Sequence, residues 1–389
     1  MVVAVRHARD EGGTVAVRSG GHCFAGRSST DGVLIDLAEL SDVGLAGGVA
    51  TVGAGIRLGA LYAALHTVGR TLPAGCGSTV GIAGLTLGGG IGLLGRLHGL
   101  TCDRLVAARV VLADGEAVDC DEHRDPDLFW ALRGGGGGQF GIVTSFRFDT
   151  VEDPLASAID IAFPRVVDIE RLTATWQQWA PDAPDQLSLA LTLERVGPSP
   201  VRALVSGVCV SPSREVRAWL ADFAVALDPA ARPVVGALRP YSSIKRAVAD
   251  PRDDATGRRL RSGFFARPMS RAEITTLVTT LRGAPAPHRR RLTFTPMGGA
   301  YNRLVPDATA FVHRRESYLL EHVGATYVPW VEASWAAAHG DQTPRVYPNF
   351  PDPGLTNPAE SYHGGNHARL AAIKRAYDPQ RLFDFPQAV

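Results

Sequence analysis

Several patterns that would fix a cellular role are missing from this sequence of 389 residues. No apolar run is long enough to span a bilayer, and the opening residues MVVAVRHARDEGG do not have the form of a signal peptide. The 40 basic and 39 acidic side chains nearly cancel, so no basic surface is expected to hold nucleic acid. We therefore predict no membrane and no nucleic-acid partner, and a small molecule as the substrate.

Cysteine and lysine are scarce. The five cysteines are an odd number without CxxC spacing, which argues against a disulfide framework and against a zinc site. We predict no metal, and reduced thiols favour a cytoplasmic protein. The basic side chains are nearly all arginine, with lysine only at Lys245 and Lys374.

The chain is long enough, with 45% hydrophobic residues, for one large domain or two ordinary ones. Its first residues read as a helix already under way that ends at glycines 12–13, so we expect the N-terminal portion to be missing. Short strand patterns and a hairpin that turns at residues 114–115 predict an α+β unit over 1–152. Residues 153–338 mix alternating strand patterns with helices, which predicts a largely antiparallel sheet, and residues 339–389 differ again.

Gly90 to Gly95 match the G-x-G-x-x-G pattern of a nicotinamide dinucleotide site. That site needs a full helix after the glycines and then a parallel strand. Only nine residues separate Gly95 from Leu105, and the strand that follows turns straight back. We therefore do not favour a nicotinamide cofactor.

Three glycine-rich stretches, residues 19–26, 81–92 and 134–141, lie beside short predicted strands. Glycine lets backbone N–H groups approach an anion closely. If the three loops converge, they can hold a pyrophosphate and the edge of a flat ring system. The alternative is that they are flexible linkers, which the apolar sequence on either side of each stretch argues against.

The stretch VRSGGHCFAGRSSTDGVLIDLAEL places His22 directly after two glycines. It resembles the flavin-attachment segment of the FAD-linked oxidases that include the berberine bridge enzyme-like oxidoreductases, in the vanillyl-alcohol oxidase/PCMH-type superfamily. Four more stretches resemble segments of this family in the same order: LPAGCGSTVGIAGLTLGGGIGLLGRLHGLTCDRLVAARVVLADG, DLFWALRGGGGGQFGIVTSFRF, PMGGAYNRLVPDATAFVHRRESYLL and YHGGNHARLAAIKRAYDPQRLFDFPQAV. The resemblance covers essentially the whole chain.

The resemblance implies an α+β, two-domain PCMH-type FAD-binding fold. Residues 1–152 would form the FAD-binding domain, residues 153–338 an antiparallel-sheet substrate domain, and residues 339–389 a segment that returns to the FAD-binding domain. FAD would be bound covalently through His22. The cofactor-binding residues implied here are Arg18, Ser19, Gly20, Gly21, His22, Gly26, Ser28, Gly81, Gly84, Gly88, Gly89, Gly92, Gly138, Gly141, Ile142, Val143 and Asn366.

The sequence departs from the family at a second flavin link. Many members attach flavin again through a cysteine in a G-x-C-P-T-V-G stretch. Counting back from Val80 and Gly81 places Gly77 where that cysteine belongs, and Cys76 lies one residue early. We therefore expect a single link through His22 and none through Cys76.

The catalytic base is expected in the segment that reads Tyr347-Pro-Asn349-Phe350-Pro-Asp352, where the family often has Y-x-N-Y-x-D. Tyr347 is the first candidate, although a tyrosine with a pKa near 10 needs a special environment to act as a base at neutral pH. Tyr362 is the second candidate, with flavin orientation beside Asn366 as its other role.

The sequence thus predicts an FAD-dependent oxidoreductase. A hydroxyl-bearing carbon or an activated C–H of a secondary metabolite or a sugar would give hydride to flavin N5, and molecular oxygen would reoxidise the flavin to yield hydrogen peroxide. Two alternatives stay open: a dehydrogenase with an acceptor other than oxygen, and a truncated protein that binds flavin without turnover.

Overall fold

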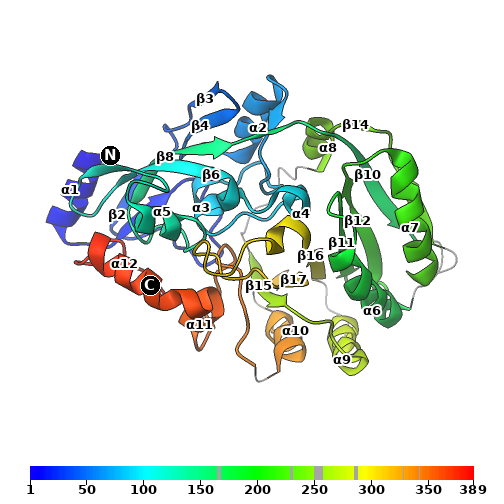
Figure 1. Cartoon of the computed structure of the whole chain (residues 1–389). Helices are drawn as coiled ribbons and strands as arrows, with labels where there is room; N and C mark the ends of the chain where they lie inside the picture. Colours follow the sequence, from blue (N-terminus) through cyan, green and yellow to red (C-terminus); the bar gives the residue numbers. More distant parts are fainter. Residues whose placement is uncertain (164–167, 228–230, 249–256, 284–287, 327, 341) are drawn as a thin grey trace.

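The structure is a computed structural model, which describes residues 1–163, 168–227, 231–248, 257–283, 288–326, 328–340 and 342–389. Two large sheets organise the chain, and the C-terminal helices pack back on the first of them (Figure 1). None of the described helices is both long and apolar enough to cross a membrane.

The first part of the chain builds a five-stranded sheet of order β3-β4-β8-β6-β7, a parallel pair β1-β2 and a short pair β5-β9. Its elements are α1 Val2–Glu11, β1 Val15–Arg18, β2 Val33–Asp36, β3 Val43–Ala46, β4 Val49–Gly53, α2 Leu58–His66, β5 Arg70–Thr71, α3 Ile82–Leu87, α4 Gly95–His98, η1 Thr101–Arg104, β6 Leu105–Val111, β7 Ala117–Cys120, α5 Pro126–Leu132, β8 Ile142–Asp149 and β9 Val151–Glu152.

Local patterns explain these elements. Helix α1 ends where Gly12 takes up a φ of 65°, a left-handed conformation that glycine adopts without strain. Strands β6 and β7 form the predicted hairpin, with Gly115 at a φ of 86° in the turn. The G-x-G-x-x-G stretch leads into α4, which has only four residues, and β6 then pairs antiparallel with both β7 and β8. This is not a βαβ unit, which agrees with the sequence argument against a nicotinamide site.

The second sheet has the order β13-β10-β12-β11-β16-β17-β15, with β14 also paired to β10, and every pairing in it is antiparallel. Its elements are β10 Leu155–Ala162, α6 Ile169–Trp179, η2 Ala180–Asp182, β11 Leu187–Arg195, β12 Arg202–Cys209, α7 Ser213–Leu227, β13 Arg232–Val235, β14 Arg239–Pro240, α8 Tyr241–Val248, β15 Arg258–Phe265, α9 Arg271–Arg282, β16 Arg290–Pro296, η3 Gly299–Asn302, β17 Tyr318–Ala325 and α10 Trp330–His339.

One face of this sheet is apolar and is covered by helices. Leu189, Leu191 and Leu193 of β11 alternate along the strand and are at most 1% exposed. Helices α6, α7, α9 and α10 lie on the side of the sheet away from the first part of the chain (Figure 1). The other face of the sheet is therefore turned toward the glycine-rich loops.

The chain ends with α11 Pro358–His363, η4 Gly364–Asn366 and α12 His367–Tyr377, and α12 packs on α5. Leu370, Ile373, Phe383 and Val389 belong to the core of the first sheet. The limits at 152 and 338 stay a prediction, because the structure gives the bounds of elements rather than of units that fold on their own.

Arg96 of α4 fastens the first part of the chain to the second. The side chain is 1% exposed, and its Nε donates to the carbonyl of Leu187 at 2.9 Å and its Nη1 to that of Pro181 at 2.8 Å. The carbonyls of Ala183 and Met297 accept further bonds from the same guanidinium. One buried cation thus binds four main-chain carbonyls beyond residue 180.

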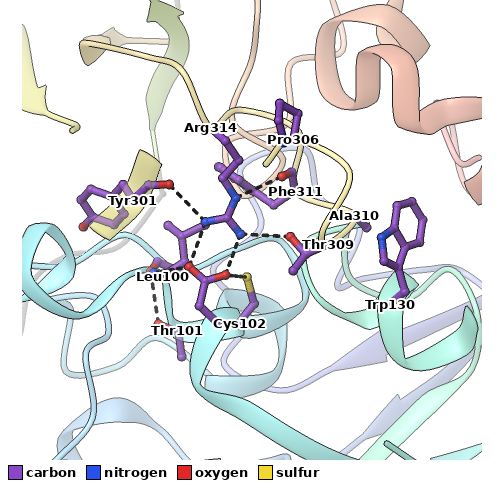
Figure 2. Close-up of polar contacts among 12 residues, drawn as sticks. Leu100, Thr101, Cys102, Trp130, Tyr301, Pro306, Thr309, Ala310, Phe311 and Arg314 are labelled. Carbon is purple, nitrogen blue, oxygen red and sulfur yellow. Dashed lines mark hydrogen bonds and ion pairs between the residues drawn. The ribbon is translucent and has the colours of Figure 1, made fainter. Parts of the chain in front are cut away.

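A second cation acts in the same way. Arg314, also 1% exposed, donates to both carboxylate oxygens of Asp103 at 2.6 and 2.8 Å. Figure 2 shows its guanidinium between the carbonyl of Tyr301, the hydroxyl of Thr309 and the turn that carries Cys102. The loop after η3 is therefore held on η1 of the first part of the chain.

We predict that Arg96→Leu lowers the free energy of unfolding by about 3 kcal/mol, because four buried carbonyls lose their donor. Urea unfolding followed by circular dichroism measures this loss. Arg109→Leu is the control, since Arg109 lies at the surface against Asp119 and its loss should cost at most about 0.5 kcal/mol. Equal losses in the two variants would contradict a fastening role for Arg96.

Candidate cofactor and active site

The three glycine-rich stretches meet around α3. A Cβ added to Gly20 would lie 2.1 Å from the nitrogen of Gly81, so the first and second stretches touch backbone to backbone. The nitrogen of Gly136 donates to the carbonyl of Leu87 at 2.8 Å, which brings the third stretch onto the end of the same helix. The convergence that the sequence interpretation requires is therefore present.

The first stretch offers backbone donors. Gly21 has a φ of 77°, and the N–H groups of Gly20 and Gly21 donate to no acceptor among the described residues. The neighbouring side chains are already bound, because Ser19 Oγ donates to the carbonyl of Ala54 at 2.7 Å and Arg18 pairs with Asp36. Backbone rather than side-chain donors are thus left for a ligand at this loop.

His22 follows directly and is half-buried. Its Nε2 lies 2.8 Å from Oγ1 of Thr79, which belongs to the second stretch. This bond joins the first stretch to the second and restricts the orientation of the imidazole. Thr79 was not among the residues that the sequence singled out.

Residues 90–92 form a different environment, because protein hydroxyls bind their backbone. Tyr347 Oη accepts from the nitrogens of Gly90 and Ile91 at 2.9 and 3.1 Å. Tyr301 Oη accepts from the nitrogen of Gly92 at 3.0 Å and donates to its carbonyl at 2.8 Å. These N–H groups are therefore used within the protein.

Close packing explains why glycine stands at 88 and 89. A Cβ on Gly88 would lie 2.2 Å from Oδ1 of Asn349, and one on Gly89 would lie 3.0 Å from the ring of Phe311. Gly92 is equally confined by the carbonyl of Ala74. The three glycines thus let the active-site segments approach, and their contact with a cofactor stays a prediction.

Tyr347 is 3% exposed and lies in an aromatic cage, with the rings of Phe264, Phe311 and Phe350 at 6.0, 6.2 and 5.1 Å between centroids. Asn349 Nδ2 donates to its hydroxyl oxygen at 3.0 Å and so adds a third donor to the two backbone N–H groups. Burial raises the pKa of Tyr347 to about 12, while these three hydrogen bonds lower it. Three donors on one phenolic oxygen stabilise the phenolate.

Tyr362 is not part of the aromatic cage around Tyr347. Its hydroxyl accepts from the nitrogen of Asp352 at 2.7 Å and donates to Oε1 of Gln387 at 3.2 Å. It lines a small surface hollow with Arg27, Gly135–Gly137 and His363. The structure therefore brings Tyr362 to the third glycine stretch and does not bring it to Tyr347.

The amide of Asn366 holds a loop, because Nδ2 donates to the carbonyls of Pro306 and Thr309 at 2.8 and 3.1 Å. Ile142 and Val143 are buried in β8, and Gly141 packs on Val110. Gly26 has open space around it, Gly138 approaches Phe385, and Ser28 is half-buried. Cofactor roles for these residues stay predictions.

The third stretch is anchored by Lys374, which is 1% exposed. Its Nζ donates to the carbonyl of Gln139 at 2.5 Å, to Asp378 at 2.6 Å and to the carbonyl of Phe383 at 2.7 Å. The nitrogen of Val389 donates to Oε1 of Gln139 at 2.7 Å. The C-terminal segment therefore fixes the glycine loop against the first sheet.

These residues fit an FAD. The N–H groups of Gly20 and Gly21 have the chemistry for a pyrophosphate. A Cβ built on Gly84 of α3 meets no protein atom within 4 Å, so space is open over this helix between the loops. No group of three His, Cys, Asp or Glu suited to a metal ion is found in the part of the chain that the structure describes.

Family models match both ends of the chain. Residues 1–121 match the FAD binding domain, and residues 346–389 match the berberine and berberine-like family. An FAD-linked oxidoreductase of Bacillus subtilis, YgaK, is 34% identical over 99% of this chain and 88% of its own length.

Solved structures match the fold. The xylooligosaccharide oxidase of Myceliophthora thermophila, in complex with xylobiose, superposes with a TM-score of 0.89 at 26% identity over 100% of this chain and 89% of its own. A glucooligosaccharide oxidase from Acremonium strictum, described with a 6-S-cysteinyl, 8α-N1-histidyl FAD, gives 0.88 at 24% identity with the same coverage.

The fold and the site define a PCMH-type flavoprotein oxidoreductase with FAD as its cofactor. Within that class, the chain belongs to the berberine bridge enzyme-like family of FAD-linked oxidoreductases. The family and fold expected from the sequence are thereby confirmed.

We predict that Gly84→Ala weakens FAD binding by about tenfold or more, because the new methyl group occupies the open space over α3. Binding of added FAD to the purified apoprotein, followed by fluorescence quenching, measures this change. Gly13→Ala is the control, since its added Cβ also meets nothing but lies outside the glycine loops. Unchanged FAD affinity in Gly84→Ala would contradict this placement.

Proposed function

We propose that FAD is attached covalently to His22 and that the enzyme oxidises a hydroxyl-bearing carbon of an oligosaccharide. Bound FAD supplies the hydride acceptor, and the chain supplies the rest. The single observation that carries the proposal is that His22, with its ring fixed by Thr79, lies on the loop whose Gly20 touches Gly81. A histidyl flavin in the glucooligosaccharide oxidase supports the attachment.

Tyr347 is the proposed base for the substrate hydroxyl. Its oxygen takes up the proton, and the N–H groups of Gly90, Ile91 and Asn349 that point at it stabilise charge in the transition state. Phe350 stands where a second hydroxyl is common in the family, so this role falls on Tyr347. Tyr362 and Asp352 hold the segment in place through the bond at 2.7 Å.

The face of the second sheet that is turned toward Tyr347 supports a hydroxyl-rich substrate. Phe264 and Leu319 are paired across β15 and β17 and pack in one cluster with Tyr347, so they mark the face that is turned toward the base. Two residues further along each strand, on the same face, Ser262 pairs with Glu321.

Glu321 is also paired with Thr293 of β16, and Thr293 with Thr192 of β11. A row of polar side chains from four strands therefore adjoins the Tyr347 cage. Hydroxyls and a carboxylate at this spacing suit the hydroxyls of successive sugar rings. An aromatic metabolite offers few hydrogen-bonding groups to such a row of polar side chains.

We predict that flavin in the wild-type protein stays with the polypeptide after acid precipitation, and that His22→Ala abolishes this retention. Thr79→Ala should lower the covalently bound fraction strongly, because the imidazole loses the bond at Nε2, and Thr79→Ser should restore it. In-gel flavin fluorescence measures the fraction. Full retention in Thr79→Ala, or noncovalent flavin in the wild type, would contradict the proposal.

For Tyr347→Phe we expect kcat to fall by about 10² or more with little change in KM. A base whose pKa is about 12 gains reactivity as the pH rises toward that value. The wild-type kcat should therefore increase from pH 6 to 10, and the variant should lose this dependence. Tyr377→Phe, far from the cage, is the control. A flat wild-type profile would exclude Tyr347 as the base.

Turnover should release hydrogen peroxide with xylobiose or chitooligosaccharides as substrate and oxygen as acceptor. Thr293→Val should raise KM by about fivefold, the equivalent of one hydrogen bond, with kcat nearly unchanged. Thr279→Val on α9, behind the sheet, should have no effect. A peroxide-coupled assay measures the turnover of the wild type and of both variants. Dye reduction without peroxide would instead identify a dehydrogenase, and turnover of aromatic alcohols alone would exclude the sugar proposal.

A further inference from the structure

Lys245 of α8 reaches the loop that precedes the second glycine stretch. The residue is 2% exposed, and its Nζ donates to the carbonyls of Ala74 and Gly75 at 3.0 and 2.7 Å. The Sγ of Cys76 lies 3.8 Å from the same nitrogen. A buried amine and a thiol, 169 positions apart in the sequence, are therefore in contact.

The surroundings of Lys245 disfavour its charge. The rings of Tyr62 and Tyr241 lie 4.6 and 5.8 Å from Nζ, and no carboxylate among the described residues pairs with it. Burial lowers the pKa of Lys245, with the neighbouring Cys76 acting in the opposite direction. The charged amine that binds these carbonyls therefore loses its proton, and becomes nucleophilic, more readily than the amine of a solvated lysine.

Cys76 differs from the other thiols in its access. Cys102, Cys120 and Cys209 are buried, whereas Cys76 and Cys23 are half-buried. Cys76 is therefore more accessible to a small oxidant than the three buried thiols, and the amine of Lys245 is in contact with it. Cys23 is half-buried like Cys76 but has no lysine amine beside it, because the only other lysine of the sequence is Lys374, which is bound to Asp378.

We propose that hydrogen peroxide links Cys76 to Lys245 through a sulfenamide. Peroxide oxidises the thiol by two electrons to a sulfenic acid and is reduced to water. The amine nitrogen then attacks sulfur, an S–N bond forms, and the sulfenic hydroxyl leaves with the amine proton as a second water. Thiol, amine and peroxide thus give one sulfenamide and two waters.

The link would tie α8 of the second sheet to the loop beside Gly77. Peroxide is the product of the proposed turnover, but the link itself does not depend on a flavin. Added peroxide therefore tests it separately from the proposed function. A cross-link between such distant positions also restricts the unfolded chain and raises the Tm.

The test treats the purified full chain with hydrogen peroxide, quenches it and digests it for mass spectrometry. We expect a peptide pair that joins Cys76 and Lys245 with the loss of two hydrogens, together with a higher Tm. A thiol reductant should reverse both. Cys23→Ser is the matched control and should keep the link.

Cys76→Ser should lose the link while keeping the lysine and the fold. Lys245→Arg should lose it too, because a guanidinium keeps the charge and the carbonyl bonds without being a comparable nucleophile. Recovery of Cys76 only as a sulfinic acid, as an unmodified thiol, or as a flavin adduct would each overturn the proposal, whatever the activity of the enzyme.

Discussion

Buried cations that bind main-chain carbonyls hold the glycine loops in place, and the flavin site depends on them. Glycine has no side chain with which to anchor a loop, and its backbone loses more freedom on folding than that of any other residue. Lys245 binds the carbonyls before the second stretch, and Lys374 binds that of Gln139 in the third. Arg96 places the helix after the second stretch against the second sheet. Hydrogen bonds from a charged donor to a carbonyl are stronger than those from a neutral donor. Three charged side chains therefore hold in place glycine loops that have no side chains of their own to anchor them.

The first and second glycine stretches use their backbone N–H groups differently. The N–H groups of Gly20 and Gly21 have no acceptor among the described residues, while those of residues 90–92 donate to the hydroxyls of Tyr347 and Tyr301. The backbone of the first stretch is thus suited to an anion, and that of the second binds the hydroxyl of the proposed base. Because Tyr347 comes from the C-terminal segment, the proposed base reaches the second glycine stretch only after the chain has passed through the second sheet and returned.

The sequence predicted what depends on neighbouring residues. The helix that ends at Gly12, the turn at Gly115 and the antiparallel second sheet are all present, because each depends on local conformation or on alternation. The contacts of the site were not predictable in the same way. His22 meets Thr79 across 57 positions and Tyr301 meets Gly92 across 209, and no local pattern marks either partner. The requirement for glycine at 88 and 89 was not predictable either, because a side chain there would collide with Asn349 or Phe311, which lie far along the chain.

The burial of both lysines has a practical result for handling this protein. Lys245 and Lys374 are 2% and 1% exposed, and the sequence has no others. Succinimidyl esters, glutaraldehyde and reductive methylation, which couple to lysine amines, will find neither of them at the surface. Dye labelling or immobilisation on a solid support is better directed at the exposed arginines or carboxylates, and modification of a lysine would itself report that the interior has opened.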